Sequence, residues 1–175
     1  MTAPAAPHPP ARPTFRHSLR VYWEDTDAGG IVFYANYLKF FERARTEWLR
    51  SYGFGQQAMV DETGCMFVVT DTSVHYKRPA RLDDLLEVTV DVRHVASASL
   101  RIGQQAWCDG ALVAEGDIRI GCVQRATLRP ARIPSAVLQA LQLEPGLPAA
   151  VEPPSAAGDI NDMNATNATN ASHPT

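Results

Sequence analysis

The chain has 175 residues, of which 45% are hydrophobic and 20% are charged. This balance is typical of a globular domain and excludes collagen, a coiled coil and a fully disordered chain. The formal net charge of −3 gives no global positive field, so we expect neither nucleic acid nor an anionic membrane surface as a partner. The sequence shows no apolar run as long as the roughly 18 residues of a membrane span and no apolar core of a signal peptide. We therefore expect a cytoplasmic protein without a membrane span.

Both ends of the chain differ in composition from its middle. Residues 1–13 are rich in proline, and residues 144–175 pass from prolines into an Asn-Ala-Thr repeat. Such segments hold too few apolar side chains to offset the entropy lost on ordering. We expect a disordered Pro-rich head, one folded domain over residues 14–143 and a disordered low-complexity tail. The N-x-S/T triplets at Asn164, Asn167 and Asn170 are attributed to the repeat rather than to glycosylation.

The strongest helical pattern covers residues 36–52. Apolar side chains recur there along one helical face, and charged side chains occupy the other sides. Asn36 is the expected N-cap, and Gly53 is the expected residue just beyond the C-terminus of the helix. A short terminal helix is expected within residues 133–143.

Alternating apolar and polar residues predict strands in the rest of the domain. The Asp109-Gly110 pair predicts a type I′ hairpin turn between two of them, because both central residues of that turn need positive φ. A further turn is expected at residues 96–98. The last four strands should form an antiparallel meander with the long helix packed on it, an α+β arrangement. The predicted strands are residues 17–23, 66–76, 86–93, 100–107 and 112–123.

The cysteines indicate neither a disulfide framework nor a metal site. Cys65, Cys108 and Cys122 are odd in number and lack C-x-x-C spacing, so we expect reduced core residues. No His/Cys/Asp cluster has the spacing of metal ligands. We therefore expect an activity without a bound metal.

One segment combines acids, glycines and aromatic residues just before the long helix, and it reads YWEDTDAGGIVFY over residues 22–34. Its carboxylates are Glu24, Asp25 and Asp27, and a glycine pair follows them. Free N–H groups at a helix N-terminus can hold a developing negative charge, so a carboxylate and such donors suffice for acyl transfer. The alternative is that Asp25 and Asp27 only cap and charge the start of the helix.

This segment, together with FERARTE at 41–47 and YKRPARLDD at 76–84, resembles the hotdog-fold acyl-CoA thioesterases of the 4-hydroxybenzoyl-CoA thioesterase group. Within that group the chain is most similar to the YbgC type associated with the Tol-Pal system. The resemblance extends over about residues 15–142. It implies a hotdog fold, in which an antiparallel sheet wraps one long helix, and hydrolysis of an acyl-CoA thioester. It also implies a homodimer or homotetramer with active sites at the subunit interface, and no cofactor, because coenzyme A is part of the substrate.

The resemblance also assigns roles within the acidic segment. Asp27 corresponds to the catalytic carboxylate, as nucleophile or general base, and the backbone N–H of Tyr34 to the oxyanion donor. Gly29 and Gly30 would keep the loop close to the thioester, and Asp25 would hydrogen-bond loop amides. YbgC-type relatives often carry His where this chain has Tyr34. A phenol with a pKa near 10 cannot replace histidine in acid–base work at neutral pH, so its side chain is expected to position substrate.

Three basic residues surround Pro79. Arg78 and Arg81, with Lys77, are expected to face the phosphates of coenzyme A; a solvated turn is the alternative. His75 is expected to be a surface histidine of its strand rather than a catalytic residue.

Two other functions compete with hydrolysis. A hotdog dehydratase needs a histidine on the central helix, and the chain has none between His17 and His75. A binding partner of acyl carrier protein or of lipid synthesis, without obligatory hydrolysis, is the remaining alternative. Such a binder would not need Asp27, whereas a thioesterase would.

Overall fold

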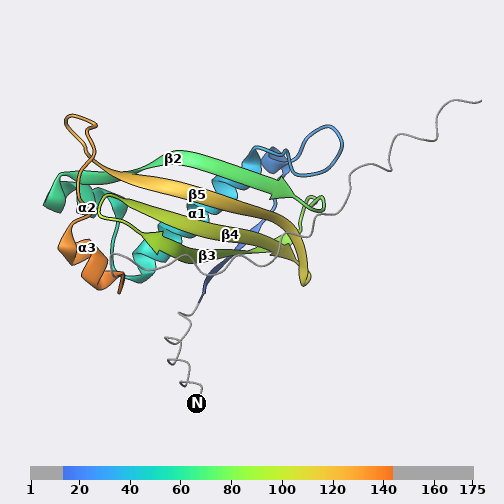
Figure 1. Ribbon diagram of the computed structural model, residues 1–175. Helices are drawn as coiled ribbons and strands as arrows, with labels where there is room; N and C mark the ends of the chain where they lie inside the picture. Colours follow the sequence, from blue (N-terminus) through green and yellow to red (C-terminus); the bar gives the residue numbers. More distant parts are fainter. Residues whose placement is uncertain (1–13, 144–175) are drawn as a thin grey trace, which may run out of the picture.

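The computed structural model describes residues 14–143 of the chain (Figure 1). The strands are β1 (Phe15–Arg20), β2 (Cys65–Tyr76), β3 (Leu85–Val95), β4 (Ser99–Cys108) and β5 (Ala111–Gln124). The helices are α1 (Asn36–Ser51), α2 (Gln56–Thr63), α3 (Ser135–Ala140) and a short 3-10 helix, η1 (Trp23–Asp25). The predicted head, residues 1–13, and tail, residues 144–175, lie outside the described residues, so the predicted domain boundaries stay a prediction.

The five strands form one antiparallel sheet in the order β1-β3-β4-β5-β2. The predicted meander is therefore wrong at one point, because β2 pairs with β5 rather than with β3. The segment between β2 and β3 crosses to the β1 side of the sheet, where its backbone is fixed. Val21 donates from its N–H to the carbonyl of Asp84 at 2.9 Å, and Asp83 donates to the carbonyl of Val21 at 3.1 Å. Strand β3 consequently lies beside β1, and β2 forms the opposite edge of the sheet.

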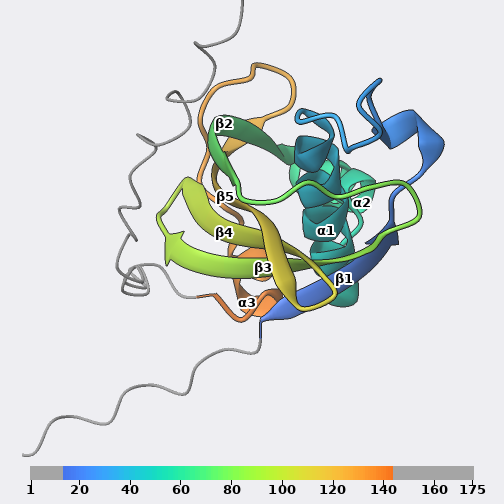
Figure 2. The same ribbon diagram turned by 90° about the vertical axis from the view of Figure 1, so that its right-hand side faces the viewer.

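Helix α1 lies against the concave side of the curved sheet (Figure 2). Its apolar face is buried, including Phe40, Phe41 and Ala44 at 0% exposure. Gly116 of β5 makes room for this contact, because a Cβ at that position would lie 2.8 Å from Cε2 of Phe41. The predicted α+β class, with a sheet wrapped around one long helix, is confirmed.

The two ends of α1 differ in how well the sequence predicted them. The N-cap is Ala35, which makes no side-chain cap, so the prediction of Asn36 as N-cap is wrong. The amide of Asn36 instead points to the preceding loop, where it donates to the carbonyl of Glu24 at 3.4 Å. At the other end Gly53 has a φ of 85°, the left-handed conformation expected just beyond a helix.

The two predicted turns are confirmed. Asp109 and Gly110 have φ values of 47° and 75°, the positive pair that a type I′ turn requires. Between β3 and β4, Ala96 donates from its N–H to the carbonyl of Ser99 at 2.8 Å. The first strand lies earlier than the predicted residues 17–23: it runs from Phe15 to Arg20, and the chain turns into η1 at Trp23.

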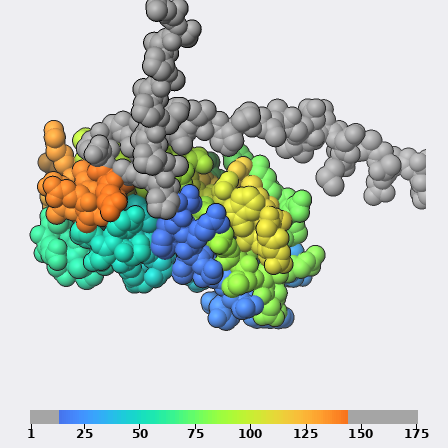
Figure 3. All heavy atoms as spheres, turned by 90° about the horizontal axis from the view of Figure 1, so that it is seen from below, coloured from blue at the N-terminus to red at the C-terminus, as the bar shows by residue number. Residues whose placement is uncertain are grey.

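Two short helices close the same end of the sheet (Figures 1 and 3). Helix α3 lies within the predicted range, and its Val137 is fully buried. Helix α2 was not predicted, because it buries only Met59 and so has no apolar periodicity to detect.

The cysteines are free thiols: Cys65 and Cys122 are buried and Cys108 is half-buried. The predicted core position is confirmed for Cys65 and Cys122, whereas Cys108 packs against the core and is only partly buried. Within residues 14–143, no helix combines the length and the apolar composition needed to cross a bilayer.

Candidate active site

The acidic segment folds back on itself as a tight loop between η1 and α1. Thr26 and Val32 form an antiparallel bridge. Inside it, Asp27 donates from its N–H to the carbonyl of Ile31 at 2.9 Å and accepts at its own carbonyl from the N–H of Gly30 at 3.0 Å. Gly30 sits at a φ of 72°, a conformation that favours glycine. Gly30 therefore permits the loop to close over so few residues.

The Asp27 side chain lies on the surface of this loop. Its Oδ1 accepts a 2.8 Å hydrogen bond from the N–H of Gly29. A Cβ on Gly29 would lie 3.1 Å from the same oxygen, so the absence of a side chain there keeps this contact open. The result is an exposed carboxylate with one oxygen held by the backbone.

Asp25 has a different environment although it lies only two residues away. It is 1% exposed, and its Oδ2 accepts the N–H of Tyr22 at 2.9 Å. Its backbone carbonyl accepts the N–H of Phe33 at 2.9 Å, and Asn36 of α1 donates to its Oδ1 at 3.5 Å. These bonds confirm the structural role expected of Asp25: it fixes the loop to the start of α1.

The entry to α1 leaves two backbone donors open. Asn36 donates from its N–H to the carbonyl of Phe33 at 2.8 Å, and Leu38 donates to the carbonyl of Ala35 at 3.1 Å. Among the described residues, the N–H groups of Tyr34 and Ala35 have no hydrogen-bond acceptor. Open N–H groups at a helix N-terminus attract negative charge.

Aromatic side chains surround this entry. The Tyr34 side chain is 61% exposed, and its ring centroid lies 4.6 Å from that of Phe33 and 6.4 Å from that of Tyr76. Tyr76 donates from its hydroxyl to the backbone carbonyl of Tyr34 at 3.0 Å. Burial raises the pKa of Tyr76, and the nearby phenol of Tyr34 raises it further. The sequence analysis missed Tyr76 as a site residue, because 42 positions separate it from Tyr34 and only the fold brings them together.

The segment after β2 lies alongside the acidic loop. Val32 donates from its N–H to the carbonyl of Ala80 at 2.8 Å, and Ile31 forms an antiparallel bridge with Arg81. Arg81 is exposed, so the structure brings this predicted substrate-binding residue next to the loop of Asp27.

The other two basic residues of this segment lie toward β5. Arg78 is exposed, and its N–H donates to the carbonyl of Val113 at 3.2 Å. Lys77 forms an ion pair with Glu115, 3.0 Å from Nζ to Oε1. The ammonium of Lys77 is thus already engaged, whereas the guanidinium of Arg78 reaches solvent.

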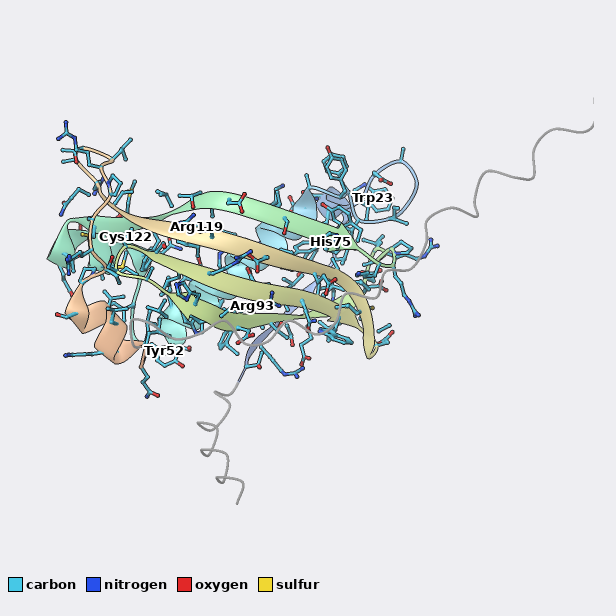
Figure 4. All side chains as sticks on the ribbon, viewed as in Figure 1. Trp23, Tyr52, His75, Arg93, Arg119 and Cys122 are labelled. Atoms are coloured by element: carbon cyan, nitrogen blue, oxygen red, sulfur yellow. The ribbon has the colours of Figure 1, made fainter. Side chains whose placement is uncertain are left out.

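His75 and Trp23 lie at this end of the molecule (Figure 4). His75 is exposed on β2, which confirms the expectation of a surface histidine. Trp23 is 79% exposed and provides an apolar surface next to the acidic loop.

Two further features bear on alternative chemistry. In the described part of the chain, no group of three or more His, Cys, Asp and Glu side chains could hold a metal ion.

A cavity of about 240 Å³ is lined by residues that include Asp71, His94 and Arg119. None of the predicted site residues lines it.

The geometry is thus an exposed carboxylate on a tight loop that leads into the start of the long helix, where two backbone N–H donors are open. Residues 21–141 match the family model of the thioesterase-like superfamily. The chain is 40% identical over 123 residues to the acyl-CoA thioesterase YbgC of Haemophilus influenzae, covering 70% of this chain and 90% of that protein. It is 41% identical over 125 residues to the acyl-CoA thioester hydrolase YbgC of Escherichia coli, covering 71% and 92%.

Solved structures agree with this relationship. A crystal structure described as a probable thioesterase from Bartonella henselae superposes with a TM-score of 0.67 at 29% identity, over 70% of this chain and 100% of that one. The chain belongs to the thioesterase-like superfamily, so the predicted hotdog fold and the predicted enzyme class, a thioester hydrolase, are confirmed. The expected similarity to the YbgC thioesterases is confirmed as well.

Proposed function

We propose that this protein hydrolyses acyl-CoA thioesters to a free acid and coenzyme A, with Asp27 as the catalytic carboxylate. The observation that carries the proposal is the placement of the Asp27 side chain. It is exposed, one oxygen is held by Gly29, and its loop runs directly into a helix entry with open N–H donors. The names of the relatives from Haemophilus influenzae and Escherichia coli support acyl-CoA as the substrate class.

The chemistry requires an attack on the thioester carbonyl and a stabilised oxyanion. Asp27 either attacks the carbonyl to form a mixed anhydride, which water then hydrolyses, or takes a proton from the water that attacks. In the anhydride route the C–S bond breaks as coenzyme A leaves as the thiolate, which takes a proton from solvent; in the general-base route the proton that Asp27 takes from water passes to the departing sulfur. The N–H of Tyr34 would hold the oxyanion, a type of contact worth about 3 kcal/mol in other enzymes.

The remaining site residues are assigned to substrate binding. Gly29 and Gly30 would let the backbone approach the thioester, and the exposed Tyr34 ring would position the acyl or pantetheine part. Arg81, whose backbone pairs with that of Ile31, and the exposed Arg78 would face the phosphates of coenzyme A. No resident cofactor is needed in this scheme.

We further propose that the active unit is a homodimer or a homotetramer, assembled through the sheets. Strand β2 supports this assembly, because it is an edge strand of 12 residues with a largely exposed surface, including Val69 at 53%. Such an edge is a template for pairing with a second strand. A cytoplasmic location and an association with the Tol-Pal system belong to the same proposal, by analogy with YbgC.

The second candidate is a binding partner of acyl carrier protein or of lipid synthesis that does not need hydrolysis. The test is thiol release from short aliphatic, long aliphatic and aromatic acyl-CoA thioesters, and from the same acyl groups on acyl carrier protein. Hydrolysis of at least one acyl-CoA with Asp27-dependent turnover is the expected result. If the folded wild-type protein hydrolyses no CoA thioester, the proposal is wrong; turnover of carrier-protein thioesters alone would move the substrate to that class.

A further inference from the structure

The start of α1 is connected to the edge strand β2 by one hydrogen bond between side chain and backbone. Tyr76 is the last residue of β2, and its hydroxyl donates to the carbonyl of Tyr34 at 3.0 Å. Tyr76 is itself held by the sheet. It pairs with Ala114 of β5, and the next residue, Lys77, donates from its N–H to the carbonyl of Val113 at 2.9 Å.

The ring of Tyr76 is fixed as well as its backbone. It packs against Tyr37 of α1 with centroids 5.5 Å apart and edge-on to Tyr34 at 6.4 Å and 82°. Tyr37 is 3% exposed, so the ring of Tyr76 rests on the core on one side. The hydroxyl is therefore presented to residue 34 from a rigid support.

Residue 34 needs such support because the helix entry supplies little of its own. The N-cap Ala35 has no side-chain cap. The peptide group before Tyr34 is held at the carbonyl of Phe33 by the N–H of Asn36 at 2.8 Å. The peptide group after Tyr34 is held at its carbonyl by the hydroxyl of Tyr76. Together the two bonds fix the backbone on both sides of the Tyr34 N–H.

We propose that Tyr76 is a positioning residue for the oxyanion site: its hydroxyl fixes the backbone of residue 34 so that the N–H groups at the start of α1 keep their direction. This inference rests on the proposed thioester hydrolysis. A donor aimed before the reaction costs no reorganisation when charge develops, so a loosened Tyr34 would slow the chemical step and leave substrate binding almost unchanged. A hydrogen bond to the carbonyl also polarises the peptide group and strengthens the N–H of Ala35 as a donor.

The raised pKa of Tyr76, caused first by burial and then by the phenol of Tyr34, keeps the hydroxyl protonated as a donor at neutral and mildly alkaline pH. The structural role of the ring is separable from that of the hydroxyl, because phenylalanine keeps the contacts to Tyr37 and loses only the donor.

The test compares Tyr76→Phe with the wild type in steady-state hydrolysis of an acyl-CoA that the wild type turns over. Removing one neutral hydrogen bond predicts a kcat about three- to tenfold lower, with KM within about twofold. Tyr52→Phe is the matched control, since Tyr52 lies at the opposite end of α1 (Figure 4), and it should leave both constants unchanged. Amide hydrogen exchange at residues 36 and 38, whose N–H groups are bonded to the carbonyls of Phe33 and Ala35, should be faster in Tyr76→Phe only.

The outcomes separate this inference from the proposed function. A wild type that hydrolyses thioesters beside a Tyr76→Phe variant with unchanged kcat overturns the positioning role alone. A loss confined to KM, or a loss without faster exchange at residues 36 and 38, also overturns it. If the folded wild type hydrolyses no thioester, both proposals fall. Thermal unfolding of the three proteins shows whether each is folded at the assay temperature.

Discussion

The N–H of Gly29 donates a 2.8 Å hydrogen bond to Oδ1 of Asp27, two residues earlier on the same loop. This bond sets the direction of an exposed carboxylate without burying it. Asp25, which is buried and bonded to Tyr22 and Asn36, holds the loop in place. Asp25 and Asp27 thus have different roles: Asp25 supports the loop, and Asp27 is presented to solvent.

Substitution of Gly29 by alanine tests the direction of the Asp27 carboxylate. The new Cβ would lie 3.1 Å from Oδ1 of Asp27, so the carboxylate must move by a few tenths of an ångström. Gly29 does not have a positive φ, so the free energy of unfolding should change by less than about 0.5 kcal/mol. We expect a clear fall in kcat with little loss of stability, measured by thiol release and urea unfolding. Wild-type kcat in Gly29→Ala would contradict this role.

Substitution of Gly30 by alanine should act on stability first. Its φ of 72° is strained for a residue with a Cβ, at a cost of roughly 1–2 kcal/mol. No atom lies within 4 Å of the added Cβ, so backbone strain alone accounts for the loss. Urea unfolding of Gly30→Ala measures it, and an unfolding free energy equal to that of the wild type would refute the strain.

Substitution of Asp25 by alanine should destabilise the fold. The N–H of Tyr22 would lose its acceptor, and the buried amide of Asn36 would keep only the carbonyl of Glu24, which costs about 1–3 kcal/mol. The matched control is Glu24→Gln, because Glu24 is an exposed acid on the same segment and should change stability by less than about 0.5 kcal/mol. Equal unfolding midpoints for the two variants would show that Asp25 does not support the loop.

A buried polar contact between helix and sheet gives a further prediction. Gln104 of β4 is 0% exposed; its Oε1 accepts from Arg45 at 2.7 Å, and its Nε2 donates to the carbonyl of Phe41 at 3.0 Å. Gln104→Leu should lower the free energy of unfolding by about 1–3 kcal/mol, because Arg45 loses its acceptor. The double variant with Arg45→Met should recover part of this loss, and strictly additive losses in urea would contradict the coupling.

The long helix, the strands and the two turns could be predicted because their signals are local. Residues 36–52 carry one apolar face, and the Asp109-Gly110 turn follows from the φ values that only some residues adopt. The position of β2 could not be predicted in this way, since alternation along a strand does not say which strand is its neighbour. The crossing of residues 77–84 depends on backbone bonds to Val21, which no pattern in the segment reveals.

The residues of the candidate site also differ in whether their signals are local in the sequence. Asp25, Asp27 and the glycine pair lie within a few residues of one another, so their chemistry is visible in the sequence. The sequence analysis placed the N-cap at Asn36 rather than at Ala35. The side-chain amide of Asn36 instead donates to the preceding loop, so it does not cap the helix. Tyr76 was missed because its contact with Tyr34 exists only in the fold.

The most direct test of Asp27 as the catalytic carboxylate is the hydrolysis of an acyl-CoA that the wild type turns over, measured for Asp27→Asn and Asp27→Ala beside Glu24→Gln. Asparagine keeps the size of the side chain and loses its charge. If Asp27 is the catalytic carboxylate, kcat/KM falls about 10²–10⁴-fold in both Asp27 variants, with Glu24→Gln close to the wild type and all proteins folded. Near-normal turnover in both Asp27 variants would contradict it.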